Sequence, residues 1–161
     1  MVWQLRRANG DDVDRIMEIE TASFHNDAWS ARGMRSEVAN PQAYYLVAFR
    51  PEFPGFVEGY AGLFCPRGAH EADIQTIAVA ESARRCGLGR LLVRSLITEA
   101  RDRGAETLFL DVRADNPGAK SLYDDLGFKE IAVRPAYYQP DGVDAIVMKL
   151  AIAPASTELA Q

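Results

Sequence analysis

The sequence predicts one domain of the mixed α/β class, and three observations predict it. The chain has 161 residues, a length that fits a single hydrophobic core. Segments rich in aromatic and β-branched residues alternate with segments whose apolar residues recur at helical spacing. The resulting order, β-α-α-β-β-β-α-β-α-β-β, places hairpin-like strand pairs beside a strand–helix–strand unit, so a doubly wound sheet is not expected.

The first half of the chain carries the signals for four strands and two helices. Asn9 is suited to cap a helix, because Asp11 and Asp12 supply the negative charge favoured in a first helical turn. A second helix is predicted to begin at Trp29 and Ser30 and to stop at Asn40-Pro41. The predicted strands of this half are residues 2–7, 43–49, 56–64 and 73–79.

The second half begins with the longest predicted helix, residues 87–103, which Gly104 ends. After a buried strand at 107–112, Asn116 caps a short helix that has Pro117 in its first position. Residues 131–133 and 145–148 are predicted to form a closing pair of strands. The domain is expected to cover residues 1–150, and residues 151–161 to form a flexible tail because they have little to bury.

Charge and composition exclude several classes of protein. The net charge of −5 argues against direct nucleic-acid binding and suits a basic protein or peptide partner. Cys65 and Cys86 do not make a disulfide framework, and neither His25 nor His70 lies in a metal-ligand pattern, so no metal is expected. The start of the chain lacks a secretory signal, and no apolar run is long enough to span a bilayer. The sequence therefore predicts a cytoplasmic protein that does not bind membranes.

The most informative motif is Arg84-x-x-Gly87-x-Gly89, between a predicted strand and a predicted helix. A helix N-terminus exposes backbone N–H groups and a partial positive charge, and glycines let the backbone approach a phosphate closely. Arg85 and Arg90 add positive charge. Taken alone, the motif fits an ordinary strand-to-helix turn equally well, because short glycine motifs recur by chance. Its spacing matches neither a P-loop nor a dinucleotide fingerprint.

Two stretches together resemble the signatures of the GNAT superfamily of N-acetyltransferases, and the likeness covers roughly residues 5–150. One stretch is 74–79 with 84–90, and the other is 116–128. The resemblance implies a central twisted, mostly antiparallel sheet with helices on both faces and a splayed strand pair that holds acetyl-coenzyme A (acetyl-CoA). It also implies that the backbone of Ile77, Ala78 and Val79 pairs with the pantetheine arm of this cofactor. The resemblance further implies that Asn116 contacts the cofactor. The residues implied to hold the pyrophosphate are Arg85, Cys86, Gly87, Leu88, Gly89 and Arg90.

Asp111 and Tyr123 are the candidate catalytic residues. Asp is disfavoured in strands, yet Asp111 interrupts an apolar strand; the simplest alternative is a strand-end carboxylate that pairs with Arg113. Tyr123 lies in the short predicted helix, where packing into the core is the commoner fate of a tyrosine. The resemblance implies that Asp111 is the general base and that Tyr123 donates a proton to the departing thiolate. Reference pKa values of ~10 for tyrosine and ~8.5 for a thiol make full transfer slightly uphill, but a hydrogen bond to the thiolate would still help.

Within the superfamily, the chain resembles the RimI-type ribosomal-protein alanine N-acetyltransferases. The likeness rests on Glu20, Phe24, Trp29, Ser30 and Glu37 and on the runs 110–116 and 134–148. It implies that the substrate is the N-terminal segment of a basic small-subunit ribosomal protein. The subgroup usually has Glu where this chain has Asp111, and the shorter side chain favours a water relay. An α-amine, with a pKa ~2.5 below that of lysine, needs ~3.4 kcal/mol less deprotonation work and suits such a base.

Other activities stay open on the sequence alone. An acetyltransferase for a small amine, such as a polyamine or an aminoglycoside, would need carboxylates to hold a polycation, and Glu18, Glu20 and Asp27 could supply them. A lysine acetyltransferase, a toxin-type acetyltransferase and a non-catalytic acyl-CoA sensor are further alternatives. The presence of both Asp111 and Tyr123 argues against the sensor.

Overall fold

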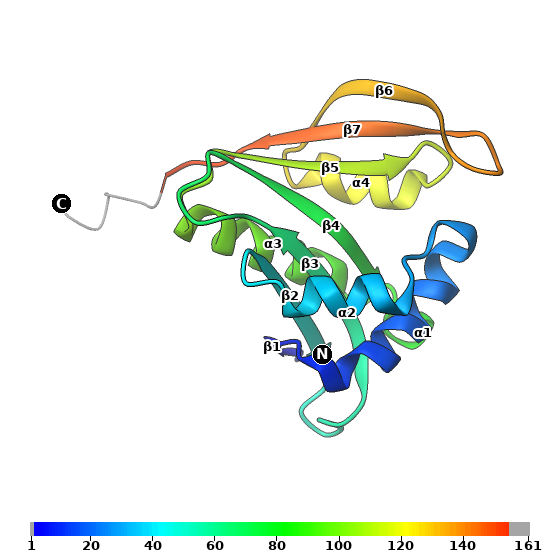
Figure 1. The fold of residues 1–161 in the computed structure, drawn as a ribbon, viewed down its shortest axis with the longest axis vertical. Helices are drawn as coiled ribbons and strands as arrows, with labels where there is room; N and C mark the ends of the chain where they lie inside the picture. Colours follow the sequence, from blue (N-terminus) through cyan, green and yellow to red (C-terminus); the bar gives the residue numbers. More distant parts are fainter. Residues whose placement is uncertain (1, 155–161) are drawn as a thin grey trace. The chain divides into compact units, whose positions relative to one another are not determined.

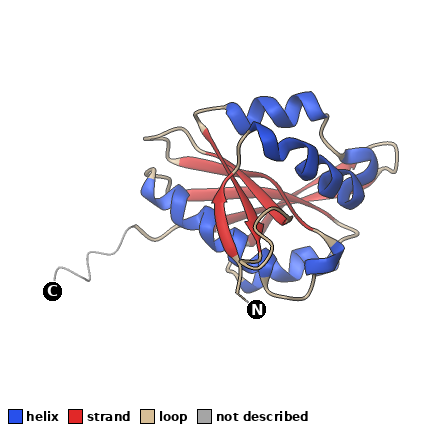
Figure 2. Cartoon of the chain, turned by 90° about the horizontal axis from the view of Figure 1, so that it is seen from below, coloured by secondary structure: helices blue, strands red, loops and turns tan. Residues whose placement is uncertain are grey.

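The chain divides into two compact units, and one strand and one helix each have residues in both units. The computed structural model describes residues 2–154. Unit 1 comprises the described residues up to Phe64 together with Ile74–Leu96. Unit 2 comprises Cys65–Asp73 together with the described residues from Ile97 onward. Strands and helices, red and blue in Figure 2, occur in both units, which agrees with the predicted mixed class.

The elements follow the predicted order. In chain order they are β1 (Gln4–Arg7), α1 (Val13–Phe24), α2 (Ala31–Ala39), β2 (Ala43–Phe49), β3 (Val57–Phe64), β4 (Glu71–Val79), α3 (Leu88–Asp102), β5 (Thr107–Arg113), α4 (Pro117–Asp125), β6 (Lys129–Tyr138) and β7 (Val143–Ala151). Three single-turn 3-10 helices, η1 (Gly10–Asp12), η2 (His25–Asp27) and η3 (Glu81–Ala83), lie between them. The predicted cap is also present, because the Asn9 side chain accepts a hydrogen bond from the N–H of Asp11 (2.8 Å).

In unit 1, β1, β2 and β3 pair antiparallel, and α1 and α2 pack against β3 and β2. Figure 1 shows the two helices, in blue and cyan, next to each other, and they are in contact. The apolar residues that predicted the helices face these strands, as amphipathic spacing requires. The buried cluster comprises Val13, Ile16, Ile19, Met34, Ala43, Tyr45, Val47, Val57, Tyr60 and Ala78.

A fully buried carboxylate, that of Glu20 on α1, joins four parts of unit 1. It accepts hydrogen bonds from the hydroxyl of Tyr60 on β3 and from the hydroxyl of Thr76 on β4 (2.8 Å). A third bond comes from the backbone N–H of Trp29, just before α2 (3.0 Å). Burying a carboxylate costs several kcal/mol unless donors replace its water, and these three donors do so. Burial, and then the charge of Glu20, raises the pKa of Tyr60, so its phenol keeps the proton that it donates.

The ring of Tyr45 on β2 occupies space that a side chain on β3 would otherwise fill. A Cβ atom placed on Gly62 would lie 2.2 Å from the Cζ atom of Tyr45. The Tyr45 hydroxyl donates to the Oε1 atom of Gln75 (2.8 Å), and the Nε2 atom of Gln75 donates to Glu37 (3.1 Å). Gly62 therefore permits a chain of contacts from β2 through β4 to α2.

The opposite face of β3 receives the start of α3. A Cβ on Gly59 would lie 2.9 Å from the Cδ2 atom of Leu88 and 3.4 Å from the Cδ1 atom of Leu92. The register between β2 and β3 shifts at this point, because Ala48 pairs with Gly59 and the next pair skips Glu58. Glu58 is thus the extra residue of a β-bulge, which bends the strand locally. Unit 1 accordingly has helices on both faces of its sheet, as predicted.

In unit 2, β4 begins beside β5, and the two strands are parallel. Their pairing covers three residue pairs, from Glu71 with Thr107 to Asp73 with Phe109. β5 pairs antiparallel with β7, and β7 with β6. The strand order is β1-β2-β3-β4-β5-β7-β6. This short parallel contact in a mostly antiparallel order agrees with the predicted splayed strand pair.

The closing strands are longer than the sequence predicted. β6 has 10 residues and β7 has 9, against the predicted 131–133 and 145–148. Pro135 interrupts the sequence pattern of a strand, which is why the prediction was too short. Because β6 is the last strand in the order, the N–H that proline lacks can face away from β7, and no hydrogen bond between strands is lost. The register shift between Arg134 and Tyr138 accommodates the interruption.

Ordered packing continues into the first residues of the predicted tail. Ala151 is the last residue of β7, and Ile152 is buried and donates its N–H to the carbonyl of Glu106 (2.9 Å). Residues 155–161 of the predicted tail lie outside the described residues. Within residues 2–154, no helix is long and apolar enough to cross a membrane.

Gly62→Ala should destabilise the protein by about 1–3 kcal/mol, because the new methyl group overlaps a buried and hydrogen-bonded ring that has no room to move. Gly55→Ala is the matched control, since a Cβ there meets nothing within 4 Å. Its free energy of unfolding should stay within about 0.5 kcal/mol of the wild type. Urea denaturation of the three proteins measures both values, and equal stability of the two variants would contradict the packing described for Tyr45.

Candidate functional site

The predicted phosphate-binding turn joins η3 to α3 within unit 1. Arg85 and Gly87 have positive φ angles, 62° and 75°. This region is unusual for a residue with a side chain, and backbone strain of this kind is concentrated at functional loops. A Cβ added to Gly87 would meet nothing within 4 Å, so the backbone of the turn borders open space. The turn can therefore be approached closely by a ligand.

The start of α3 provides the electrostatics that an anion needs. The N–H of Leu91 bonds back to the carbonyl of Gly87 (3.1 Å). The amides of the first helical residues, including Leu88 and Gly89, have no carbonyl of the helix to bind and lie at the positive end of its dipole. Arg85 lies in the turn and Arg90 in the first turn of α3, so both arginines are near these amides in sequence and a phosphate group suits this position.

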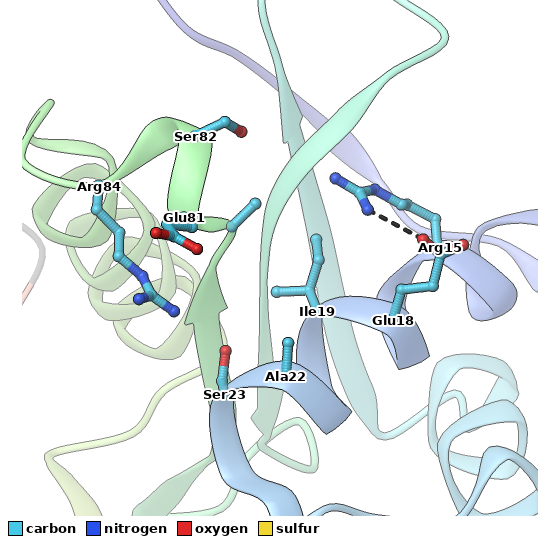
Figure 3. Close-up of a pocket in the computed structure, with 9 residues that line it drawn as sticks. Arg15, Glu18, Ile19, Ala22, Ser23, Glu81, Ser82 and Arg84 are labelled. Atoms are coloured by element: carbon cyan, nitrogen blue, oxygen red, sulfur yellow. Dashed lines mark hydrogen bonds and ion pairs between the residues drawn. The ribbon is translucent and has the colours of Figure 1, made fainter.

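Arg84, the first arginine of the motif, is engaged with the end of β4. Its Nε atom donates to the carbonyl of Val79 (3.3 Å). Figure 3 shows its side chain in a hollow between η3 and α1, together with Glu81. The hollow is lined by Arg15, Glu18, Ile19, Ala22 and Ser23 of α1 and by Ala80, Glu81, Ser82 and Arg84. Because it carries both signs of charge, the hollow is less suited to an anion than the turn beside it.

Sequence reasoning missed the residue that anchors this turn, Glu58 on β3. Its side chain is fully buried and accepts two hydrogen bonds from Arg50 (2.6 and 3.2 Å) and one from the Ser82 hydroxyl (2.9 Å). Its carbonyl also accepts the N–H of Ala80 (2.8 Å). A glutamate within a strand of small and apolar residues was the available signal, because Glu is depleted from strands.

The residues predicted to bind the cofactor belong to both units. Those from Ile77 to Arg90 lie in unit 1, and Asn116 lies in unit 2. The predicted helix cap at Asn116 is confirmed, since its Oδ1 atom accepts the N–H of Ala119 (3.1 Å). The cap fixes the side chain at the start of α4, and its amide group is the part with donors to offer a ligand.

Tyr123, the predicted proton donor, lies on α4 in unit 2 and is buried, with 7% of its surface exposed. Its ring packs edge-on against Phe128, with 5.8 Å between the ring centres. Burial, and to a smaller extent Tyr138, raises the pKa of Tyr123 to about 12. The phenol therefore keeps its proton at neutral pH and can donate a hydrogen bond.

Asp111, the predicted base, lies on β5, and a third of its side chain is exposed (33%). Its Oδ2 atom is 3.9 Å from the Nε atom of Arg134 on β6. The guanidinium of Arg113, the alternative partner, binds Asp115 (3.0 Å) and Asp141 (3.0 Å). Asp111 is thus an accessible carboxylate with a cation nearby.

Two tyrosines at the end of β6 flank these arginines. Tyr137 and Tyr138 pack edge to face, with 5.1 Å between their ring centres. The guanidinium of Arg134 lies over the ring of Tyr137 (5.8 Å), and that of Arg113 lies over the ring of Tyr138 (5.0 Å). Tyr137 is half exposed (52%), so part of its ring is available to a ligand.

A second carboxylate, Asp73 on β4, lies on the same face as Asp111. Asp73 pairs with Phe109, two residues before Asp111, and residues two apart in a strand share a face. Burial first, then the charges of Glu71 and Asp111, raises the pKa of Asp73. Unit 2 therefore holds two carboxylates whose negative charges repel each other. Sequence reasoning had singled out only Asp111.

The carboxylates that could have held a polycation do not form one site. Glu20 is fully buried and used by its three donors, whereas Glu18 is exposed (67%) and pairs with Arg15. A carboxylate enclosed in this way cannot reach a soluble amine, which removes one of the three groups proposed for that role. Among residues 2–154, no group of three or more His, Cys, Asp and Glu residues is placed to hold a metal ion.

Comparisons with known proteins agree with the fold and the motifs. Residues 13–128 match the acetyltransferase (GNAT) family. The chain is 33% identical over 149 residues to the putative ribosomal protein bS18-alanine N-acetyltransferase of Bacillus subtilis, which covers 92% of this chain and 95% of that one. The crystal structure of the ribosomal-protein-S18-alanine N-acetyltransferase of Escherichia coli is 32% identical, with a TM-score of 0.83 and 97% of both chains covered. An uncharacterised protein of Mycobacterium leprae is 36% identical over 143 residues, but the chain spans only 38% of its length.

These matches identify the class of protein. The chain belongs to the acetyltransferase (GNAT) family, as its sequence motifs predicted. Within that family it is similar to enzymes named for the acetylation of an alanine of a ribosomal protein.

Proposed function

We propose that the protein transfers an acetyl group from acetyl-CoA to the N-terminal α-amine of a protein, with the N-terminal alanine of a small-subunit ribosomal protein as its substrate. The observation that carries this proposal is the similarity, over nearly the whole of both chains, to relatives named as bS18-alanine N-acetyltransferases. The net charge of −5 supports it, because ribosomal proteins are basic.

In this proposal the cofactor is held by its phosphates and by its pantetheine arm. The open backbone at Gly87, the amides that begin α3 and the two neighbouring arginines support a pyrophosphate at Arg85, Cys86, Gly87, Leu88, Gly89 and Arg90. Ile77, Ala78 and Val79 offer backbone groups to the pantetheine arm, past the point where β4 pairs with β5. Asn116 contributes the amide group of its capped side chain.

The reaction then consists of direct attack by the amine on the acetyl carbonyl. Asp111 accepts the proton of the α-ammonium group through a water molecule, which its short side chain requires. The amine forms the new C–N bond, and the developing oxyanion takes a hydrogen bond from a backbone N–H near Val79. When the C–S bond breaks, the electron pair stays on the thiolate of coenzyme A, which the Tyr123 hydroxyl stabilises. The second proton, which the nitrogen loses as the amide forms, passes through water to this thiolate.

The high pKa of Tyr123 defines its part in this step. A value of about 12 is ~3.5 above that of an ordinary thiol, so complete proton transfer to the thiolate would be uphill by about 5 kcal/mol. A hydrogen bond to the developing negative charge has no such cost and strengthens as the charge grows. Tyr123 is therefore proposed as a hydrogen-bond donor in the transition state rather than as a full acid.

A peptide assay tests the proposal. With acetyl-CoA, release of thiol should follow peptides that begin with a free alanine amine. It should fall by at least about tenfold when that amine is blocked, whether or not the peptide contains lysine, because the lysine amine needs ~3.4 kcal/mol more deprotonation work. Release that follows lysine, or release with polyamines alone, would contradict the proposed substrate.

Asp111→Asn should lower kcat by about 100-fold or more, the usual contribution of a positioned general base. Asp111→Glu should keep most of the activity, because it preserves the carboxylate. The control is Glu52→Gln, which removes an exposed carboxylate from the loop between β2 and β3 and should leave kcat unchanged. Equal kcat values for the wild type and Asp111→Asn at every pH would exclude Asp111 as the base.

Tyr123→Phe should lower kcat by about tenfold to a hundredfold while the KM for acetyl-CoA stays the same, because the lost hydrogen bond is stronger in the transition state. Since the pKa of Tyr123 is about 12, any loss of activity between pH 8 and pH 10 belongs to another group. The wild type and Tyr123→Phe should thus share the same alkaline limb in a pH–kcat profile. Full turnover by the variant at saturating acetyl-CoA would rule out the donor role.

A further inference from the structure

The turn between β4 and α3 is fixed at both ends by two consecutive residues of β3. Upstream, Glu58 holds Ser82 of η3 through its carboxylate and Ala80 through its carbonyl. Downstream, the space left by Gly59 receives Leu88 and Leu92, at the start of α3. The four residues between Ala83 and Leu88 thus span two anchored points on one bulged strand.

The upstream anchor uses a charged group where an apolar residue would be expected. The Glu58 side chain has no exposed surface, although its neighbours on β3 are small or apolar. Such a charge persists only with strong partners, and here they are Arg50, at 2.6 Å, and the Ser82 hydroxyl, at 2.9 Å. The bulge explains how this side chain reaches η3, since Glu58 is the residue left without a partner in the register with β2.

We propose that Glu58 and Ser82 are positioning residues for the phosphate-binding turn, and that their hydrogen bond sets the affinity for the pyrophosphate of acetyl-CoA. The inference rests on the proposed function of that turn. Arg85 holds a positive φ angle two residues after η3, so the position of η3 decides where the amides and arginines of the turn lie. If the turn is held in place before the ligand arrives, binding does not have to include the loss of conformational entropy that fixing the turn would require.

Ser82→Ala separates this role from a general role in folding, because it breaks one bond and leaves the Glu58–Arg50 pair intact. The KM for acetyl-CoA should rise about tenfold, as expected for one hydrogen bond to a charged group, while kcat changes less than twofold. Ser82→Thr retains a hydroxyl and should restore the KM. The matched control is Ser95→Ala on α3, whose hydroxyl donates to the Leu91 carbonyl (2.9 Å) and whose loss should leave the KM unchanged.

Acetyl-pantetheine, which carries the acetyl thioester without the pyrophosphate, is the second cofactor in this experiment. Its KM should be the same for the wild type and Ser82→Ala. If Ser82→Ala raises the KM of both cofactors, or lowers kcat with both, the bond has only a structural role and the inference is overturned. An unchanged KM for acetyl-CoA in Ser82→Ala also overturns it. If the wild type uses both cofactors equally well, the phosphate site itself is wrong, which is a failure of the proposed function.

Discussion

The buried carboxylate of Glu20 is the constraint on which the arrangement of unit 1 depends. A charge without access to water must find donors, and Glu20 draws them from β3, β4 and the residue that precedes the cap of α2. Any of these segments that moved away would leave part of a buried charge unsatisfied, at a cost of several kcal/mol. The strand that carries the proposed pantetheine contacts is therefore held against α1 by a polar requirement as well as by apolar packing.

β3 shapes unit 1 through two glycines, which have no side chain, and through one buried glutamate. Gly62 leaves room for Tyr45 on one face, and Gly59 leaves room for Leu88 on the other. Glu58 then supplies the one charged side chain of the strand, at the bulge where it can reach η3. A strand that packs helices on both faces this closely can hold the proposed phosphate-binding turn in place.

Much of the fold followed from local signals, and the exceptions have physical reasons. The spacing of apolar residues, Asn9, Asn116 and the glycine of the turn predicted the element order because each acts within a few residues of itself. The full length of β6 was not predictable in this way, since Pro135 breaks strand patterns everywhere except at an edge, and an edge is a property of the assembled sheet.

The site shows the same difference between local sequence signals and properties of the assembled structure. The turn and Tyr123 could be proposed from sequence because each lies in a contiguous motif. Glu58 and Ser82 are 24 residues apart and have meaning only as a pair, so neither stood out. For Glu20 the sequence suggested a function that the structure does not support. Its position near other acidic residues in the sequence suggested a binding cluster, whereas its burial gives it a structural role.

The chemistry of unit 2 favours an easily deprotonated amine. Asp111, the proposed base, is accessible to water, and its Oδ2 atom lies 3.9 Å from the Nε atom of Arg134. Asp73, whose pKa is raised, shows what enclosure and neighbouring charge do on the same face of the sheet. A lysine amine is ~2.5 pKa units more basic than an α-amine, so it costs ~3.4 kcal/mol more to deprotonate. The family of the chain leaves several amines possible, and this difference in deprotonation cost is the physical reason to prefer the N-terminus of a protein as the proposed substrate.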